Sequence, residues 1–162
     1  MNQTRTPQSM QARTSVNRLF RQLIDDLEDP ATIRLMLQGM IEQLEPRTVQ
    51  DLDIRQAWLF AKLLYIEAGG LPQAEAIKWL YSLYDQLCGL PASQYNRRLA
   101  LITASMLSRM TTRGNPYGAT AREVIHEHVY WPGTPWALRR LAIRAMLGRP
   151  LHLEYWRDQL PG

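Results

Sequence analysis

The sequence is poor in cysteine, with a single one, Cys88, in 162 residues. One cysteine excludes an intrachain disulfide framework, and it is typical of a cytoplasmic protein or of one kept in another reducing compartment. Cys88 also falls on the apolar stripe of a predicted helix, at the end where the helix dipole disfavours a thiolate. We therefore expect a buried, unreactive thiol and not a nucleophile.

Long hydrophobic runs are also absent. The longest, near residues 57–66, is shorter than the roughly 18 residues that a membrane span requires, and Lys62 interrupts it. The first fifteen residues carry arginines but no apolar core, so we expect no secretory signal. The hydrophobic share of 46% and the charged share of 21% are ordinary for a folded globular protein, which makes disorder of the whole chain a poor interpretation.

Motifs of catalysis and metal binding are missing. The sequence contains no G-x-S-x-G, no phosphate-binding Walker loop, no H-E-x-x-H and no dinucleotide fingerprint. His126 and His128 lie two residues apart, which on a helix places them about 200° apart, so they cannot hold one ion together. We expect a non-enzymatic protein without a metal or a cofactor.

Alternation with period two is absent over any convincing length, whereas apolar residues recur at steps of three and four, as in Val16, Leu19, Phe20 and Leu23. The pattern predicts an all-α fold, a compact single-domain bundle of about seven to eight helices with mostly antiparallel neighbours. The expected helices cover about 14–27, 30–45, 48–68, 73–88, 93–112, 119–130 and 135–147, with a last turn within 151–160.

The sequence predicts a short N-terminal arm followed by one helical domain. Residues 1–13 are polar and hold two arginines and no acids, which predicts a flexible basic arm. Residues 14–162 form the expected single helical domain, acidic-leaning over 14–90 and basic over 91–162. Thr14 or Ser15 would cap the first helix, and Asp51 would be the acid of a capping box that starts near Thr48.

Lysine is nearly absent, because seventeen of the nineteen basic residues are arginine. A base-composition bias in the genome would give the same preference. The charge is unevenly placed: residues 1–90 hold nine basic and eleven acidic residues, while residues 91–162 hold ten and four. The net charge is therefore −2 in the first part and +6 in the second.

The arginines of the basic part are the main candidate site. The guanidinium fork suits phosphate or carboxylate and stacks on aromatic rings. Trp136, Arg140 and Arg144 lie one turn apart on one predicted helix face, a mixture that suits base stacking with phosphate neutralisation. The same mixture equally suits cation–π packing inside one protein. We predict that a basic face within residues 97–149 contacts nucleic acid or another polyanion in a larger assembly. The predicted contact residues are Arg97, Arg98, Arg109, Arg113, Arg122, Arg139, Arg140, Arg144 and Arg149.

Other interpretations of the same features stay open. The acids of residues 25–29 and 42–53 could neutralise the arginines within the molecule or between self-associating copies. The chain could also be a helical adaptor or chaperone-like module for a protein partner, with a methionine-lined groove. A plain solvated face is the remaining interpretation. The methionines considered for the groove are Met36, Met40, Met106 and Met110.

An aromatic, proline-rich corner interrupts the predicted helices between residues 130 and 136. Tyr130, Trp131 and Trp136 are the predicted partner contacts there, since tryptophan and arginine are enriched among interface hot spots. The alternative is a rigid plug that orients the last two helices.

Overall fold

The computed structural model of the protein describes residues 7–25, 28–49 and 51–149. These residues form seven α-helices and one 3-10 turn and contain no strand, which confirms the predicted all-α fold. The elements are α1 (Pro7–Ile24), α2 (Pro30–Leu44), η1 (Glu45–Arg47), α3 (Leu52–Glu67), α4 (Gln73–Cys88), α5 (Gln94–Met110), α6 (Pro116–Tyr130) and α7 (Trp136–Met146).

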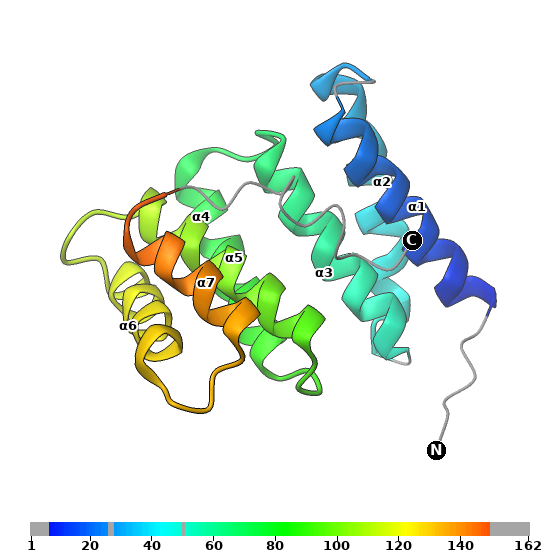
Figure 1. Ribbon diagram of the computed structural model, residues 1–162. Helices are drawn as coiled ribbons and strands as arrows, with labels where there is room; N and C mark the ends of the chain where they lie inside the picture. Colours follow the sequence, from blue (N-terminus) through cyan, green and yellow to red (C-terminus); the bar gives the residue numbers. More distant parts are fainter. Residues whose placement is uncertain (1–6, 26–27, 50, 150–162) are drawn as a thin grey trace. The chain divides into compact units, whose positions relative to one another are not determined.

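The helices divide between two compact units. The N-terminal unit, residues 1–71, contains α1, α2, η1 and α3 (Figure 1). The C-terminal unit, residues 72–155, contains α4 to α7. The predicted polyanion-binding arginines and the aromatic corner all belong to the C-terminal unit.

Helix α3 is the central element of the N-terminal unit and packs against both α1 and α2. Its side chains are buried around most of the helix circumference. Phe60 meets Phe20 of α1 edge to face, with ring centroids 5.4 Å apart. Arg34 of α2 donates to the carbonyl of Ala68, 2.9 Å away, and so holds the end of α3.

The first helix starts earlier than the sequence suggested. Helix α1 begins at Pro7, not near Thr14 or Ser15, because proline is well tolerated in a first helical turn. Residues 7–13 of the predicted arm are therefore helical. Residues 1–6 lie outside the described part of the chain.

The third helix starts later than predicted, because Asp51 is itself the N-cap. Its carboxylate accepts hydrogen bonds from the backbone N–H groups of Asp53 and Ile54, at 2.9 and 3.2 Å. Thr48 instead donates its hydroxyl to the carbonyl of Glu45 and so closes the 3-10 turn. The sequence analysis correctly identified Asp51 as a capping residue. It placed Asp51 in the first turn of a helix capped by Thr48, whereas Asp51 is the N-cap itself.

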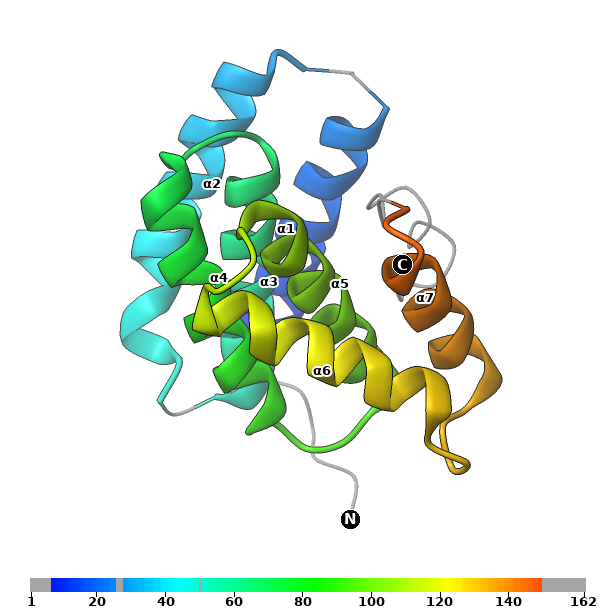
Figure 2. The same ribbon diagram turned by 90° about the vertical axis from the view of Figure 1, so that its left-hand side faces the viewer.

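Helix α5 is the central element of the C-terminal unit and contacts α4, α6 and α7. Figure 2 shows α6 passing across α5, with α7 on the other side of the unit from α4. Leu101, Ile102 and Ala104 of α5 are fully buried. This helix is as extensively buried as α3.

The last two described helices begin at prolines or directly after one. Helix α6 begins at Pro116 and not near Ala119, since the Asn115 side chain accepts from the N–H of Tyr117 and caps it. Helix α7 begins at Trp136 after Pro135, and the expected Thr134 side-chain cap does not form. The predicted last turn within 151–160 lies outside the described residues.

Candidate functional site

Most of the predicted arginines have no partner within the described part of the chain. Arg98 bonds the side chain of Gln94 at 3.1 Å, and Arg139 bonds the carbonyl of Trp131 at 2.7 Å. Arg144 is half-buried and engaged with another group. Among the described residues, the following side chains make neither a hydrogen bond nor an ion pair: Arg97, Arg109, Arg113, Arg122, Arg140 and Arg149.

Three of these unpaired arginines line one cavity of about 530 Å³, which we call the cationic pocket. Arg109 comes from the last turn of α5, Arg113 from the following loop and Arg122 from α6. No acidic residue is among its lining residues, so an anion entering the pocket would meet no like charge there. The lining residues are Ser108, Arg109, Thr111, Arg113, Arg122, Ile125, His126, Ala145, Met146 and Gly148.

Helix geometry explains only part of this arrangement. A cation in the last turn of a helix is favoured by the macrodipole, and Arg109 occupies such a position in α5. Arg113 lies beyond the end of α5 and Arg122 lies in the middle of α6, where this effect is small. Three converging guanidinium groups repel one another, so the pocket as a whole favours a bound anion.

Gly118 allows the elements around the cationic pocket to approach each other. This glycine is buried in the first turn of α6. A Cβ atom there would collide with the Thr111 side chain and would lie 3.2 Å from Nη1 of Arg122. The Thr111 hydroxyl already donates to the carbonyl of Leu107, at 2.7 Å. The glycine therefore lets α6 carry Arg122 up to the end of α5.

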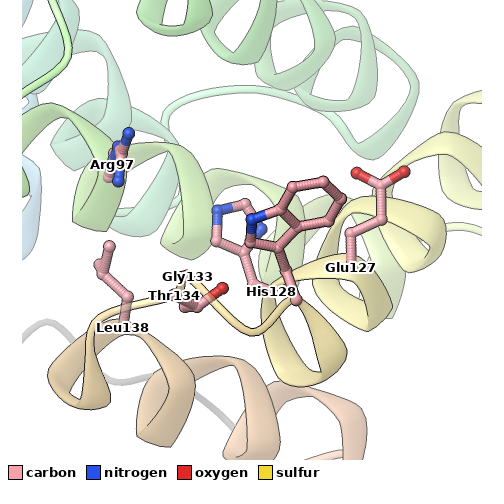
Figure 3. A pocket seen from close by; sticks show the side chains of 7 residues that line it. Arg97, Glu127, His128, Gly133, Thr134 and Leu138 are labelled. Carbon is pink, nitrogen blue, oxygen red and sulfur yellow. The ribbon is translucent and has the colours of Figure 1, made fainter.

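A second cavity, which we call the corner pocket, lies where α5 begins, α6 ends and α7 begins. Its volume is about 300 Å³. Figure 3 shows Arg97 of α5 and Glu127 of α6 at opposite sides of it, with His128 between them. The lining residues are Arg97, Glu127, His128, Trp131, Gly133, Thr134 and Leu138.

The backbone of the aromatic corner is held at several points. The Trp131 N–H donates to the carbonyl of Glu127 at 2.8 Å. The Trp131 carbonyl accepts from the backbone N–H of Thr134 at 3.1 Å and from Arg139 at 2.7 Å. A Cβ at Gly133 would lie 3.2 Å from Nε1 of Trp131, so the glycine sits close under the indole. The corner therefore presents a tryptophan from a fixed backbone.

The three predicted aromatic contacts are all exposed. The exposed fractions of Tyr130, Trp131 and Trp136 are 63%, 67% and 64%. Trp136 and Arg140 lie one turn apart on α7 and both face solvent, whereas Arg144, the third member of the predicted stripe, is half-buried. Both predicted roles of the corner are thus compatible with its geometry: it is rigid, and it is exposed.

The two neighbouring histidines lie on different sides of α6. His126 lines the cationic pocket and stacks near Tyr130, with ring centroids 4.5 Å apart. His128 lines the corner pocket, and its Nδ1 lies 2.8 Å from the carbonyl of Val124. Among the described residues, no cluster of three or more histidine, cysteine or carboxylate side chains could hold a metal ion.

Cys88 differs from its prediction, because its side chain is exposed and not buried. It lies at the end of α4 in a cavity of about 250 Å³ that shares Arg97 and His128 with the corner pocket. Burial, followed by a hydrogen bond with Cys88, raises the pKa of the Tyr84 hydroxyl above its ordinary value. The apolar stripe of α4 is interrupted in its last turn, which the sequence pattern did not indicate.

A second shifted group lies in the N-terminal unit. Burial lowers the pKa of the Lys62 ammonium, and the charge of Glu45 opposes this effect. The Lys62 nitrogen lies 4.2 Å from the ring centroid of Trp58, a cation–π contact within α3. This pair stabilises the unit internally and is not part of the C-terminal pockets.

The four methionines considered for a groove differ in exposure and are distributed over both units. Met106 is buried, Met36 is exposed, and Met40 and Met110 are half-buried. Met36 and Met40 belong to the N-terminal unit and the other two to the C-terminal unit. The sequence did not indicate the two pockets, although Arg109 and Arg113 of the cationic pocket lie only four residues apart in it.

No helix within the described ranges is both long and apolar enough to cross a membrane.

Comparisons with protein-family models, with curated proteins and with solved structures gave no match. A functional proposal for this chain therefore depends on its own geometry and charge.

Proposed function

We propose that the C-terminal unit binds single-stranded nucleic acid and holds backbone phosphates in the cationic pocket. The observation that carries this proposal is the convergence of Arg109, Arg113 and Arg122 on one cavity without an acidic lining residue. Guanidinium groups bind phosphate oxygens through paired N–H donors, and they remain charged at any physiological pH.

The surroundings of the pocket favour a strand over a small free anion. Trp136 and Arg140 are exposed on α7, and Ala145 and Met146 near the end of the same helix line the cationic pocket. Exposed aromatic rings next to cations are the surface that single-stranded nucleic acids use, with bases stacked and phosphates neutralised. The described C-terminal unit also holds ten basic and four acidic residues, which favours association with a polyanion.

The first prediction concerns the salt dependence of binding. The variant R109Q/R113Q/R122Q removes three cations from the pocket, and we expect its affinity for a labelled single-stranded oligonucleotide to fall. For single strands, each neutralised phosphate contributes about 0.7 to the slope of log affinity against log salt. Three lost contacts should therefore reduce the slope by roughly two, as measured by fluorescence anisotropy across a salt series.

The matched control is R18Q/R21Q/R47Q, which removes three exposed arginines of the N-terminal unit and changes the net charge equally. We expect a much smaller loss for this variant. Equal losses for the two triple variants would show that binding follows the total charge and not the cationic pocket. Absence of oligonucleotide binding by the unmodified protein would contradict the proposal directly.

A protein-binding adaptor is the second candidate function. The exposed Trp131 and Trp136 favour it, since tryptophan is frequent at interface hot spots. Purification from the native host separates the two candidates. Co-purifying material that nuclease removes supports nucleic-acid binding, whereas an acidic protein that stays bound after nuclease treatment supports the adaptor.

A further inference from the structure

The corner pocket has the size and the lining of a site for one planar heterocycle. Its volume of about 300 Å³ is at the lower end of the range for ligand pockets, about 300–1,000 Å³. A single base fits such a volume better than a whole nucleotide or a folded element. Trp131 supplies an exposed aromatic ring at the rim, on a backbone fixed by hydrogen bonds at its N–H and carbonyl.

The corner pocket has a hydrogen-bond donor, Arg97, at one side and a hydrogen-bond acceptor, Glu127, at the other. Arg97 offers only donors and the Glu127 carboxylate only acceptors, and neither side chain makes a hydrogen bond or an ion pair with the described residues. Figure 3 shows His128 between them. The Nδ1 of His128 faces the Val124 carbonyl and donates to it, so a neutral ring has only its Nε2 acceptor left.

Guanine fits this combination of groups. Its O6 and N7 atoms are adjacent acceptors that an arginine fork can bind together. Its N1–H and 2-amino group are adjacent donors that a carboxylate can accept together. Adenine has no carbonyl for the arginine fork, and uracil and cytosine lack one of the two paired edges.

We infer that the corner pocket takes one unstacked guanine base, with Trp131 as stacking partner, Arg97 at the O6 and N7 edge, and Glu127 at the N1 and 2-amino edge. This inference rests on the proposed function for its biological ligand, a guanine-containing single strand.

Helix α7 sets the position of this base along the strand. Leu138 lines the corner pocket and Ala145 lines the cationic pocket. Seven residues of α-helix rise about 10 Å, and a stacked strand rises about 3.4 Å per nucleotide. The base in the corner pocket is therefore about three nucleotides from the phosphates in the cationic pocket.

The test uses the full chain and the four free nucleosides, which are uncharged and do not need the cationic pocket. Binding is followed by NMR through the indole N–H signal of Trp131, assigned with W131F. We expect guanosine to shift this signal and the other three nucleosides to shift it far less. Inosine, which lacks the 2-amino group, and 7-deazaguanosine, which lacks N7, should each bind more weakly than guanosine.

The variant E127Q should lower guanosine affinity about tenfold, because a charge-assisted hydrogen-bond acceptor is lost. The matched control is E123Q, which removes another exposed carboxylate of α6 that does not line the pocket. Equal shifts for all four nucleosides, or equal effects of E127Q and E123Q, would overturn the inference.

Failure of the two proposals can be told apart. If oligonucleotides bind with the predicted salt slope but guanosine does not shift the Trp131 signal, the corner pocket is not a guanine site and the proposed function stands. If guanosine binds as expected but no oligonucleotide does, the corner pocket is a nucleoside site and the strand-binding function is wrong.

Discussion

At the scale of single residues, the unpaired arginines can be substituted to test binding without changing the stability of the fold. Arg109, Arg113 and Arg140 make no hydrogen bond or ion pair within the described chain. Exposed substitutions away from caps and cores usually change the free energy of unfolding by less than about 0.5 kcal/mol. Neutralising these arginines should therefore leave the fold intact, so that a loss of binding can be attributed to the lost charges.

Gly118 is the opposite case, a residue without charge on which the pocket depends. The substitution G118A places a methyl group against the Thr111 side chain, whose hydroxyl is fixed by the Leu107 carbonyl. Because the neighbour cannot move without losing this bond, we expect a loss of about 1–3 kcal/mol in the free energy of unfolding. Urea unfolding followed by circular dichroism measures the change.

Gly39 provides the control for this prediction, since it also lies inside a helix, α2, and a Cβ there would meet nothing within 4 Å. We expect G39A to stabilise the protein by about 0.5–1 kcal/mol, because alanine loses less backbone entropy than glycine in a helix. A stabilising G118A, or equal effects of the two substitutions, would show that α6 does not need a close approach at this point.

Single-residue expectations from the sequence succeeded where local geometry alone decides. The separation of His126 and His128 onto different sides of α6 follows from two steps of about 100° along a helix. The exposure of Cys88 depends on which helices cover the end of α4, which is tertiary information. Periodicity within one helix contains no such information, so the predicted burial was wrong.

At the scale of elements, the apolar period identified the seven described helices, and the errors were concentrated at helix starts. Asp51 and Asn115 are both short polar caps, and each begins its helix at a residue that the stripe pattern does not mark. Helix α1 extends back to Pro7 through a polar stretch. A stretch of polar residues has no apolar periodicity whether it is helical or not. The sequence pattern therefore could not locate the start of α1.

The pockets could be predicted only in part for a related reason. Arg109 and Arg113 are near neighbours in sequence, so the chain itself keeps them close, although Arg113 lies beyond the end of α5. Arg122 and Ala145 join them only because α6 and α7 pack against α5, and no local pattern specifies that packing. The predicted set thus contained the arginines of both pockets, but the sequence could not divide them between the two pockets.

The connection between α6 and α7 gives a prediction at this scale. The variant R139Q removes the guanidinium group that donates to the Trp131 carbonyl at 2.7 Å. With one anchor lost, the corner should open more often, and the Thr134 amide, which donates to the same carbonyl, should exchange its hydrogen faster. Hydrogen exchange followed by NMR at this amide measures the effect.

The neighbouring substitution R140Q is the control, because Arg140 is exposed and has no partner among the described residues. It changes the charge of α7 by the same amount and should leave exchange at Thr134 unchanged. Equal acceleration in both variants would mean that charge on α7, and not the bond to the corner, protects the amide.

At the scale of the whole molecule, the predicted contact arginines all lie in one of the two compact units. The boundary between the two compact units follows Leu71. The acidic-leaning part of the sequence ends near residue 90, and the ten basic residues that follow include all of the arginines that line the pockets. A polyanion should therefore act on the C-terminal unit while it leaves the N-terminal unit largely unaffected.

Hydrogen exchange with mass spectrometry on the full chain tests this division. A ligand that binds the native state stabilises it by about 2.7 kcal/mol at a hundredfold excess over its dissociation constant. If a single-stranded oligonucleotide binds at the two pockets, the added protection should appear in peptides from the end of α5, from α6 and from α7. Peptides from α1 and α2 should exchange at their free rates.

The pattern of protection distinguishes binding at the cationic pocket from diffuse attraction to the net charge of the chain. Protection spread evenly over both units would indicate that the oligonucleotide responds to the net charge of the chain, because diffuse attraction has no preferred element. Protection confined to α1 and α2 would contradict the assignment of the site altogether. If the cationic pocket holds the strand, R109Q/R113Q/R122Q should abolish the protection over the C-terminal helices and R18Q/R21Q/R47Q should preserve it. Because the two variants carry the same net charge, this difference is expected only from binding at the pocket.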